Sequence, residues 1–266
     1  MFAESGLDAL KNRLKILDVW VDPVSRVQCL EKVTHYLREG NRPHTVFAVN
    51  PEKNFSVPRD AILYAAFKSA DLLIPDGIGI VVAARMLYGV KLTRLPGVEL
   101  MEDICALAAR QGRKVFAYGA KEEVNRAAVE ILKKRYPGLN ICGRSHGYVA
   151  PEEMQSLIQK INASEAEILF LALGSPKQEK WLAAHRDSLE TVRVCQGIGG
   201  ALDTIVGNVR RAPTVWQRYH AEWFYRLVSE PGRLKRQKVL PVFATMVLIA
   251  WLKMNGHKKD RGWVGL

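Results

Sequence analysis

Short apolar runs alternate with amphipathic stretches along most of this chain. The apolar runs, bounded by Gly, Pro or polar residues, predict buried strands at 14–19, 45–49, 71–74, 114–118, 140–142, 168–173 and 192–196. The stretches between them carry apolar residues at helical spacing and predict helices at 25–39, 58–69, 78–87, 98–111, 121–135, 151–162 and 176–185. This alternation predicts an α/β fold with a layered, mostly parallel sheet.

The pattern changes after residue 206, where Trp, Tyr and Arg are interleaved. We therefore predict two parts, a catalytic α/β domain at 1–206 and a helical, basic appendage at 207–266. Within the appendage, residues 239–252 form an apolar run of fourteen, whereas a membrane-spanning helix needs about twenty such residues. The run is therefore expected either to lie at a membrane surface or to pack on the body of the protein. Basic residues on both sides, with Trp251 and Trp263, favour the membrane surface.

Charge is concentrated in this appendage. Of the formal net charge of +12, residues 207–266 contribute twelve Lys and Arg against three Asp and Glu. Such a positive field attracts nucleic acid, anionic lipid or a phosphorylated substrate. The four cysteines are scattered singly, which indicates a reducing compartment and no structural zinc. Residues 1–12 lack the apolar core of a signal peptide, so a cytoplasmic protein is expected.

Three predicted strands end in polar segments that parallel strands would bring to one sheet edge. Asn50 follows the strand at 45–49, Asp76 follows 71–74, and residues 174–179, which include Gln178, follow 168–173. Asp76 has two interpretations, a catalytic carboxylate or a cap for the helix that begins near Ile78. Asn50 and Gln178 can hydrogen-bond sugar hydroxyls, although Asn50 and Ser175 are also ordinary helix caps.

Glycines and arginines supply the remaining candidates. The segment 197–200, Gly-Ile-Gly-Gly, lacks the full dinucleotide fingerprint and indicates close approach of backbone to a ligand or a helix. Gly199, and Gly174 after the neighbouring strand, are candidate substrate-binding positions. No Asp-x-Asp occurs, so we predict no metal and no cofactor. A diphosphate would then require arginines, for which the candidates are Arg226, Arg233 and Arg236, unless these form a solvated basic face near anionic lipid.

Together these segments resemble the WecG/TagA/CpsF glycosyltransferases of bacterial surface-polymer assembly. The resemblance is carried in order by residues 50–53 (NPEK), 74–79 (IPDGIG), Arg94 with Gly97, 174–179 (GSPKQE), and Glu222, Trp223, Arg226 and 232–236 (GRLKR). It implies a Rossmann-like fold and metal-independent, inverting transfer of a sugar, N-acetylmannosamine-like or another hexose, from a UDP-sugar. It also implies a polyprenyl-diphosphate-linked sugar acceptor at the inner face of the cell membrane.

The resemblance also implies roles for individual residues. Asp76 corresponds to the proposed general base, and Asn50, Arg94 and Gln178 correspond to sugar or acceptor contacts. Arg226, Arg233 and Arg236 correspond to appendage arginines that close over the UDP diphosphate. The chain departs from the family at Ala48, where members often carry Thr, and this change removes a hydroxyl from the expected site.

Two other function classes fit part of the sequence. A nucleotide-binding oxidoreductase would account for the α/β pattern and the glycines at 197–200. A basic nucleic-acid-binding module would account for the charged appendage, but the apolar run at 239–252 does not suit a phosphate-tracking surface. We therefore expect a transferase that does not bind nucleic acid. The sequence names neither the donor sugar nor the polymer and leaves the oligomeric state open, a homo-oligomer included.

Overall fold

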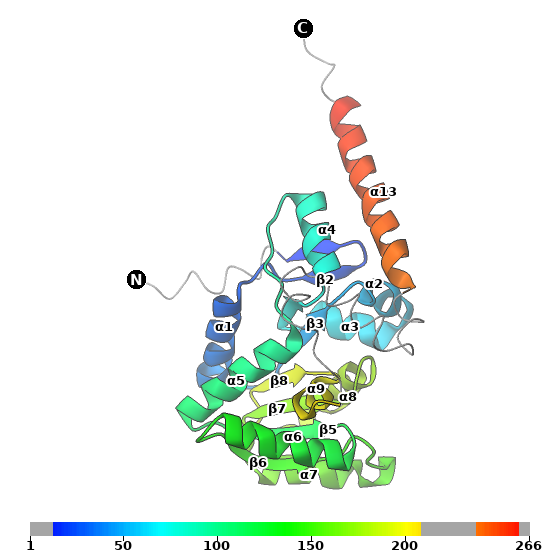
Figure 1. Cartoon of the computed structure of the whole chain (residues 1–266). Helices are drawn as coiled ribbons and strands as arrows, with labels where there is room; N and C mark the ends of the chain where they lie inside the picture. The colour runs from blue at the N-terminus through cyan, green and yellow to red at the C-terminus, as the bar shows by residue number, and fades with distance from the viewer. Residues whose placement is uncertain (1–12, 209–237, 261–266) are drawn as a thin grey trace.

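The computed structural model describes residues 13–208 and 238–260 of the 266-residue chain. Its centre is a six-stranded sheet in which all neighbouring strands are parallel (Figure 1). The strand order is β4-β3-β8-β7-β5-β6. The strands are β3 (His44–Val49), β4 (Leu72–Pro75), β5 (Lys114–Gly119), β6 (Asn140–Ser145), β7 (Ile168–Ala172) and β8 (Val194–Gly197). The predicted α/β class and the parallel, layered, Rossmann-like sheet are confirmed.

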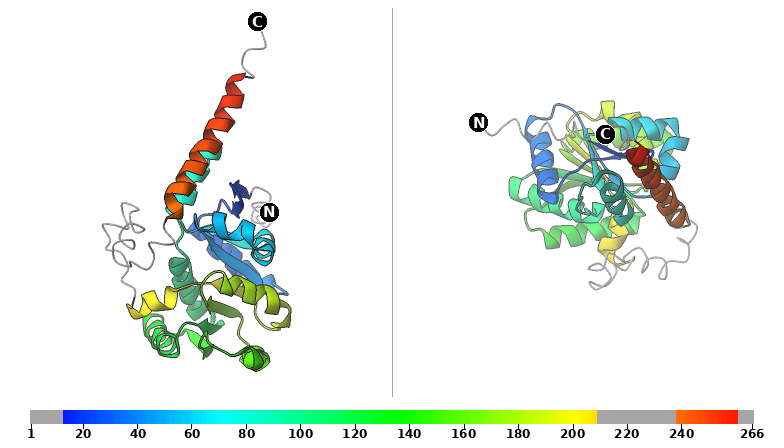
Figure 2. Two further views of the ribbon diagram at one scale, coloured as in Figure 1. Left: turned by 90° about the vertical axis from the view of Figure 1, so that its right-hand side faces the viewer. Right: turned by 90° about the horizontal axis from the view of Figure 1, so that it is seen from above.

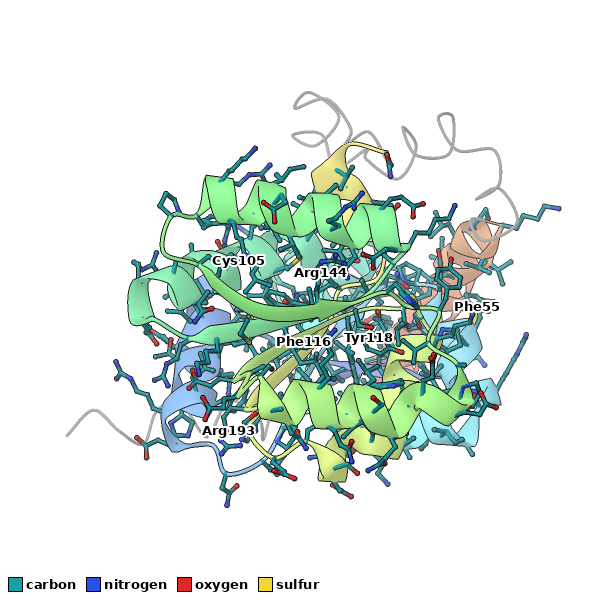
Figure 3. The ribbon with its side chains drawn as sticks, turned by 90° about the horizontal axis from the view of Figure 1, so that it is seen from below. Phe55, Cys105, Phe116, Tyr118, Arg144 and Arg193 are labelled. Carbon is teal, nitrogen blue, oxygen red and sulfur yellow. The ribbon has the colours of Figure 1, made fainter. Side chains whose placement is uncertain are left out.

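Helices cover both faces of the sheet, and strand alternation determines which side chains meet them. In β7, Leu169 and Leu171 pack into one core and Ile168 and Phe170 into the other, because successive strand side chains point to opposite faces. Figure 3 shows Phe116 on one side of the strands and Cys105 on the other. One face carries α3 (Ala61–Ser69), α4 (Ile78–Tyr88), α7 (Met154–Ala163) and α8 (Lys177–His185), and the other carries α1 (Arg26–Glu39), α5 (Gly97–Gln111), α6 (Glu122–Arg135) and α9 (Ala201–Val206).

The first predicted strand, at 14–19, is wrong. The chain instead forms a hairpin of β1 (Leu14–Ile16) and β2 (Val19–Val21), a separate two-stranded antiparallel sheet. Leu17, with a φ of 55°, lies in the turn between the two strands. The turn was missed because a leucine occupies a position that normally favours Gly or Asn. An apolar run was thus misread as one continuous strand.

The predicted helix at 58–69 is also interrupted. A 3-10 turn (Val57–Arg59) ends at Asp60, whose side chain accepts a hydrogen bond from the Leu63 amide and caps α3. Asp60 thus marks a helix start that the apolar spacing concealed. The short helices α2 (Lys53–Ser56) and α9 were not predicted, and two further 3-10 turns (Pro151–Glu153 and Arg186–Ser188) flank α7 and α8.

The apolar run near the C-terminus is part of a long helix, α13 (Val239–Asp260), which extends away from the sheet beside α4 (Figures 1 and 2). Phe243 and Val247 are buried in the core that α4 shares. Phe243 lies near Gly79, where a Cβ would be 3.4 Å from its ring, an ordinary contact distance. No helix in the described ranges is long and apolar enough to cross a membrane. Six large apolar residues of α13 are exposed, namely Val242, Leu248, Ile249, Trp251, Leu252 and Met254.

A carboxylate at the amino-terminal edge of the sheet is expected to stabilise the fold. Asp71 precedes β4, and its carboxylate accepts hydrogen bonds from Arg42 at 2.5 Å and from the Thr45 amide at 2.9 Å. Burial alone would raise the pKa of Asp71, but the hydrogen bonds with His44 and Arg42 outweigh it and hold the pKa well below its usual range.

We expect Asp71→Asn to lower the free energy of unfolding at pH 7 by about 2 kcal/mol, because hydrogen bonds to a charged acceptor are the stronger ones. Because the folded-state pKa is depressed, the carboxylate stabilises the fold fully above its unfolded-state pKa, and this stabilisation decreases as pH falls toward the folded-state pKa. Urea unfolding at pH 7 and pH 3 measures the effect. An Asn variant whose deficit is the same at both pH values would contradict this account.

Candidate active site

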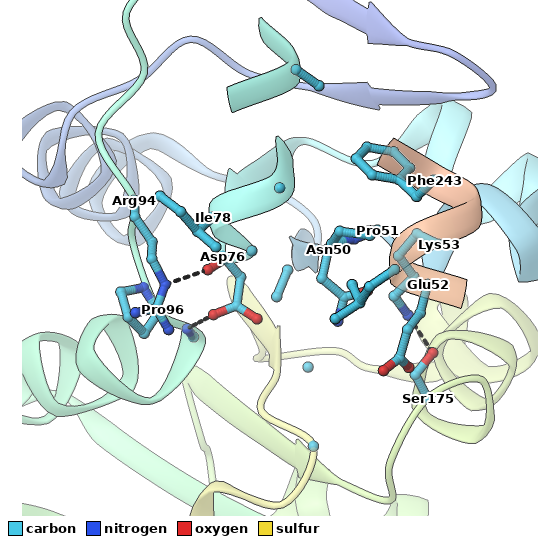
Figure 4. A pocket seen from close by; sticks show the side chains of 18 of the residues that line it. Asn50, Pro51, Glu52, Lys53, Asp76, Ile78, Arg94, Pro96, Ser175 and Phe243 are labelled. Atoms are coloured by element: carbon cyan, nitrogen blue, oxygen red, sulfur yellow. Dashed lines mark hydrogen bonds between the residues drawn. The ribbon is translucent and has the colours of Figure 1, made fainter. Parts of the chain in front are cut away.

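A cleft opens where the helices that follow two adjacent strands go to opposite faces of the sheet. The chain leaves β3 toward α3 on one face, and it leaves β8 toward α9 on the other. Such a switch point is where parallel α/β sheets bind ligands. The cleft measures about 870 Å³, and residues from the ends of β3, β4 and β8 and from α4, α5, α8, α9 and α13 line it (Figure 4).

Asp76 lies in this cleft directly after β4. Its backbone amide donates to the Val49 carbonyl at 3.1 Å, so the end of β3 positions it. The half-buried carboxylate accepts a hydrogen bond from the Gly97 amide at 3.3 Å (Figure 4). Helix α4 has Gly77 as its N-cap and no side-chain cap, so the cap interpretation is wrong for α4. The carboxylate instead faces the positive end of α5.

Arg94 holds the other side of the Asp76 turn. Its Nε donates to the Asp76 backbone carbonyl at 2.8 Å, as Figure 4 shows. The adjacent Leu95 amide donates to Pro75 at 2.8 Å. The loop before α5 is thereby fixed to the end of β4, and the sequence-predicted residues Arg94 and Asp76 are brought together in one cleft.

Asn50 lines the cleft from the end of β3. Its Oδ1 is buried and has no hydrogen-bond partner in the part of the chain that the structure describes. The expected cap interpretation therefore fails for Asn50. Gly77 packs closely against this turn. A Cβ at Gly77 would lie only 2.7 Å from Pro51 Cδ and 3.0 Å from Asn50 Cβ, so a glycine is needed there. A buried acceptor without a protein donor is costly, and this one lies in the wall of the cleft.

Gln178 reaches the cleft from the first turn of α8. Its Oε1 accepts from the Gly199 amide at 3.0 Å, and both residues line the cleft. A Cβ on Gly197 would lie 2.5 Å from Gln178 Nε2, so the glycine leaves room for this amide. Gly174 does not line the cleft, and its carbonyl accepts from the Gln178 amide at 3.0 Å. Ser175 does not cap α8, because its hydroxyl accepts a hydrogen bond from Lys53.

Several cleft residues were missed by the sequence reasoning. Lys53 and Glu179 form a buried ion pair, which was not predicted although both residues lie in segments that carry the resemblance. Phe243 reaches the cleft from α13, and Lys238 reaches it from the position directly before α13. Only their long-range packing reveals these roles. Arg226, Arg233 and Arg236 lie outside the described residues. Within the described ranges, no group of three or more His, Cys, Asp or Glu residues is placed to hold a metal ion.

Comparison with known proteins decides the family. The model of the glycosyl transferase WecG/TagA/CpsF family matches residues 14–257. The chain belongs to this family. The match covers the central sheet, the cleft and most of α13. The predicted glycosyltransferase class is therefore confirmed.

Two curated relatives from Bacillus share most of this family member's length. One, from Bacillus spizizenii, is 35% identical over 215 residues, which cover 81% of this chain and 82% of the relative. The other, from Bacillus subtilis strain 168, is 34% identical over 224 residues, or 84% and 85% of the two chains. Both are named N-acetylglucosaminyldiphosphoundecaprenol N-acetyl-beta-D-mannosaminyltransferase.

Proposed function

We propose that this protein transfers a hexose, such as N-acetylmannosamine, from a UDP-sugar to a sugar carried on a polyprenyl diphosphate, with inversion and without a metal ion. The names of the two relatives support the lipid-linked acceptor and the mannosamine-type donor. The observation that carries the proposal is the carboxylate of Asp76, which lies directly after β4 in the cleft at the switch point of the sheet.

In this proposal Asp76 is the general base. Its carboxylate takes the proton from the acceptor hydroxyl while that oxygen attacks the anomeric carbon from the face opposite UDP. The new carbon–oxygen bond forms as the bond to the diphosphate breaks, and UDP leaves with the electron pair. The contacts from Gly97 and Arg94 support this role, because they fix the Asp76 turn against α5 and the loop before it.

Asn50 and Gln178 are proposed to hold the sugar hydroxyls, with Arg94 and the backbone at Gly199 completing the substrate site. The unpartnered Asn50 Oδ1 supports this assignment. Gly174 is proposed to act indirectly. Its carbonyl accepts a hydrogen bond from the Gln178 amide and so supports the first turn of α8. This arrangement distributes substrate contacts over the ends of β3, β7 and β8.

The leaving diphosphate is proposed to be neutralised by the appendage residues Arg226, Arg233 and Arg236. Guanidinium groups bind phosphate oxygens in bidentate fashion and stay charged, so they stabilise the negative charge that develops on UDP. Lys238, which follows these arginines in the chain, lines the cleft and supports the assignment.

The appendage, residues 207–266, is also proposed to place the enzyme on the inner face of the cell membrane. The exposed apolar residues of α13 support this, since they lie in a segment rich in basic residues. Attachment would bring the cleft to a lipid-linked acceptor. Donor hydrolysis in the bulk cytosol would be limited in the same way.

The proposal is tested with a panel of UDP-sugars and a short-chain polyprenyl diphosphate that carries N-acetylglucosamine. We expect UDP release and a disaccharide product with one donor, an inverted anomeric configuration by NMR, and activity that persists in EDTA. No UDP release with any donor would contradict the proposal. A melting temperature that rises with reduced nicotinamide nucleotide but not with UDP would favour an oxidoreductase instead.

A further inference from the structure

A buried ion pair joins two sides of the cleft. Lys53 Nζ donates to Glu179 Oε1 at 2.9 Å and also to the Ser175 hydroxyl. The same ammonium lies 5.0 Å from the centre of the Phe67 ring. Lys53 and Glu179 are only 6% and 1% exposed, although both line the cleft. This pair links α2, which follows β3, to the first turn of α8, which follows β7.

Stability alone does not account for this pair. Removing two charges from water costs about as much as their attraction returns, so apolar side chains of similar size are often at least as stable. In addition, Glu179 Oε2 is buried and has no hydrogen-bond partner within residues 13–208 and 238–260. The place of the pair between two turns that line the cleft, and not its energy, points to a geometric role.

The elements that the pair joins carry the proposed sugar contacts. The Lys53 amide donates to the Asn50 carbonyl at 3.0 Å, which closes the turn that presents Asn50. Glu179 directly follows Gln178, whose side chain accepts from Gly199 at 3.0 Å. A connected series of contacts therefore runs from the end of β3 through the ion pair to α8 and the end of β8.

We propose that Lys53 and Glu179 are positioning residues that set the separation between Asn50 and Gln178, so that both reach the donor sugar at once. This inference rests on the proposed function of the cleft. A displacement of about 1 Å at a positioned contact lowers the rate by about a hundredfold. Because the diphosphate is assigned to other residues, the pair is expected to act on kcat and not on affinity for UDP.

The test is the double variant Lys53→Met/Glu179→Met, which removes both charges and leaves no buried ion unpaired. We expect its melting temperature to remain within about 5 °C of the parent. We expect kcat to fall between about tenfold and a hundredfold, with the Kd for UDP unchanged. Hydrogen exchange of the Lys53 and Gln178 amides should become faster, because the turns that hold them are no longer tied together.

A matched control removes another ion pair, far from the cleft. Arg113 and Glu167 are 2.5 Å apart beside the amino-terminal ends of β5 and β7, and their side chains are each about one-quarter exposed. The variant Arg113→Met/Glu167→Gln is expected to keep the parental kcat and the parental exchange at Lys53 and Gln178. This control separates a general effect of ion-pair loss from an effect on the cleft.

A second variant, Glu179→Asp, keeps the charge but shortens the side chain by one methylene. It should fold, and its kcat should fall with an unchanged Kd for UDP. Parental kcat in both Glu179→Asp and the double variant would overturn the inference, as would a double variant that does not fold, since the pair would then be structural. A parent protein without transferase activity would instead refute the proposed function, while the exchange measurement would still test the link between the turns.

Discussion

Replacing Asp76 with asparagine is expected to lower kcat for sugar transfer by at least about a hundredfold, because an amide cannot accept the proton of the attacking hydroxyl. The variant keeps an oxygen that accepts from the Gly97 amide, so the turn after β4 should be preserved. Affinity for UDP should therefore remain close to that of the parent. Steady-state kinetics with the best donor, together with calorimetric titration of UDP, measures both quantities.

Asp203→Asn is the matched control. Asp203 lies in the first turn of α9, near the cleft, but it does not line the cleft. The same chemical change at this position should leave kcat close to the parental value. If Asp76→Asn retains more than about a tenth of parental kcat, Asp76 is not the base. Loss of UDP binding together with kcat would point to a collapsed site instead.

Removing residues 207–266 is expected to abolish transfer and membrane association together. The truncated chain lacks Arg226, Arg233 and Arg236, as well as Lys238 and Phe243, which line the cleft. Without cations near the leaving diphosphate, we expect the rate to fall by about a thousandfold or more. Flotation with anionic vesicles, run alongside the transfer assay, measures the two losses in one preparation.

Arg233→Ala examines the same claim with a single change. A charge-assisted contact contributes about 1.5–3 kcal/mol, so affinity for UDP should fall between about tenfold and a hundredfold. Lys253→Ala is the control, since Lys253 is exposed on α13 and does not line the cleft.

For the chain without residues 207–266, circular dichroism and the melting temperature verify that the truncated body is folded. Full transfer activity in a folded truncated protein would rule out a role for the appendage.

Much of the local structure was predictable from short-range patterns. Apolar runs located the six strands of the central sheet, and the segments that follow β3, β4 and β7 do converge on one cleft. These predictions succeeded because the carboxyl ends of parallel strands share an edge whatever the order of the strands. The strand order itself was not predictable, since periodicity does not specify which strands pair.

Other features depended on contacts between distant residues. The cap interpretation of Asp76 failed because its carboxylate contacts α5, twenty-one positions along the chain. The hairpin turn at Leu17 was missed because the residue that occupies it is apolar. Nothing in the sequence around Phe243 indicated that it packs near Gly79, because the two residues are far apart in the chain.

The sequence alone determined the alternation of strands and helices, the position of Asp76 after a buried strand and the family, because each of these depends on neighbouring residues or on motifs in order. Tertiary structure decided the partners of Asp76, the packing of α13 on α4 and the pairing of Lys53 with Glu179 across 126 positions. Such pairings arise only when folding brings distant segments together, and burial then makes a charged partner necessary.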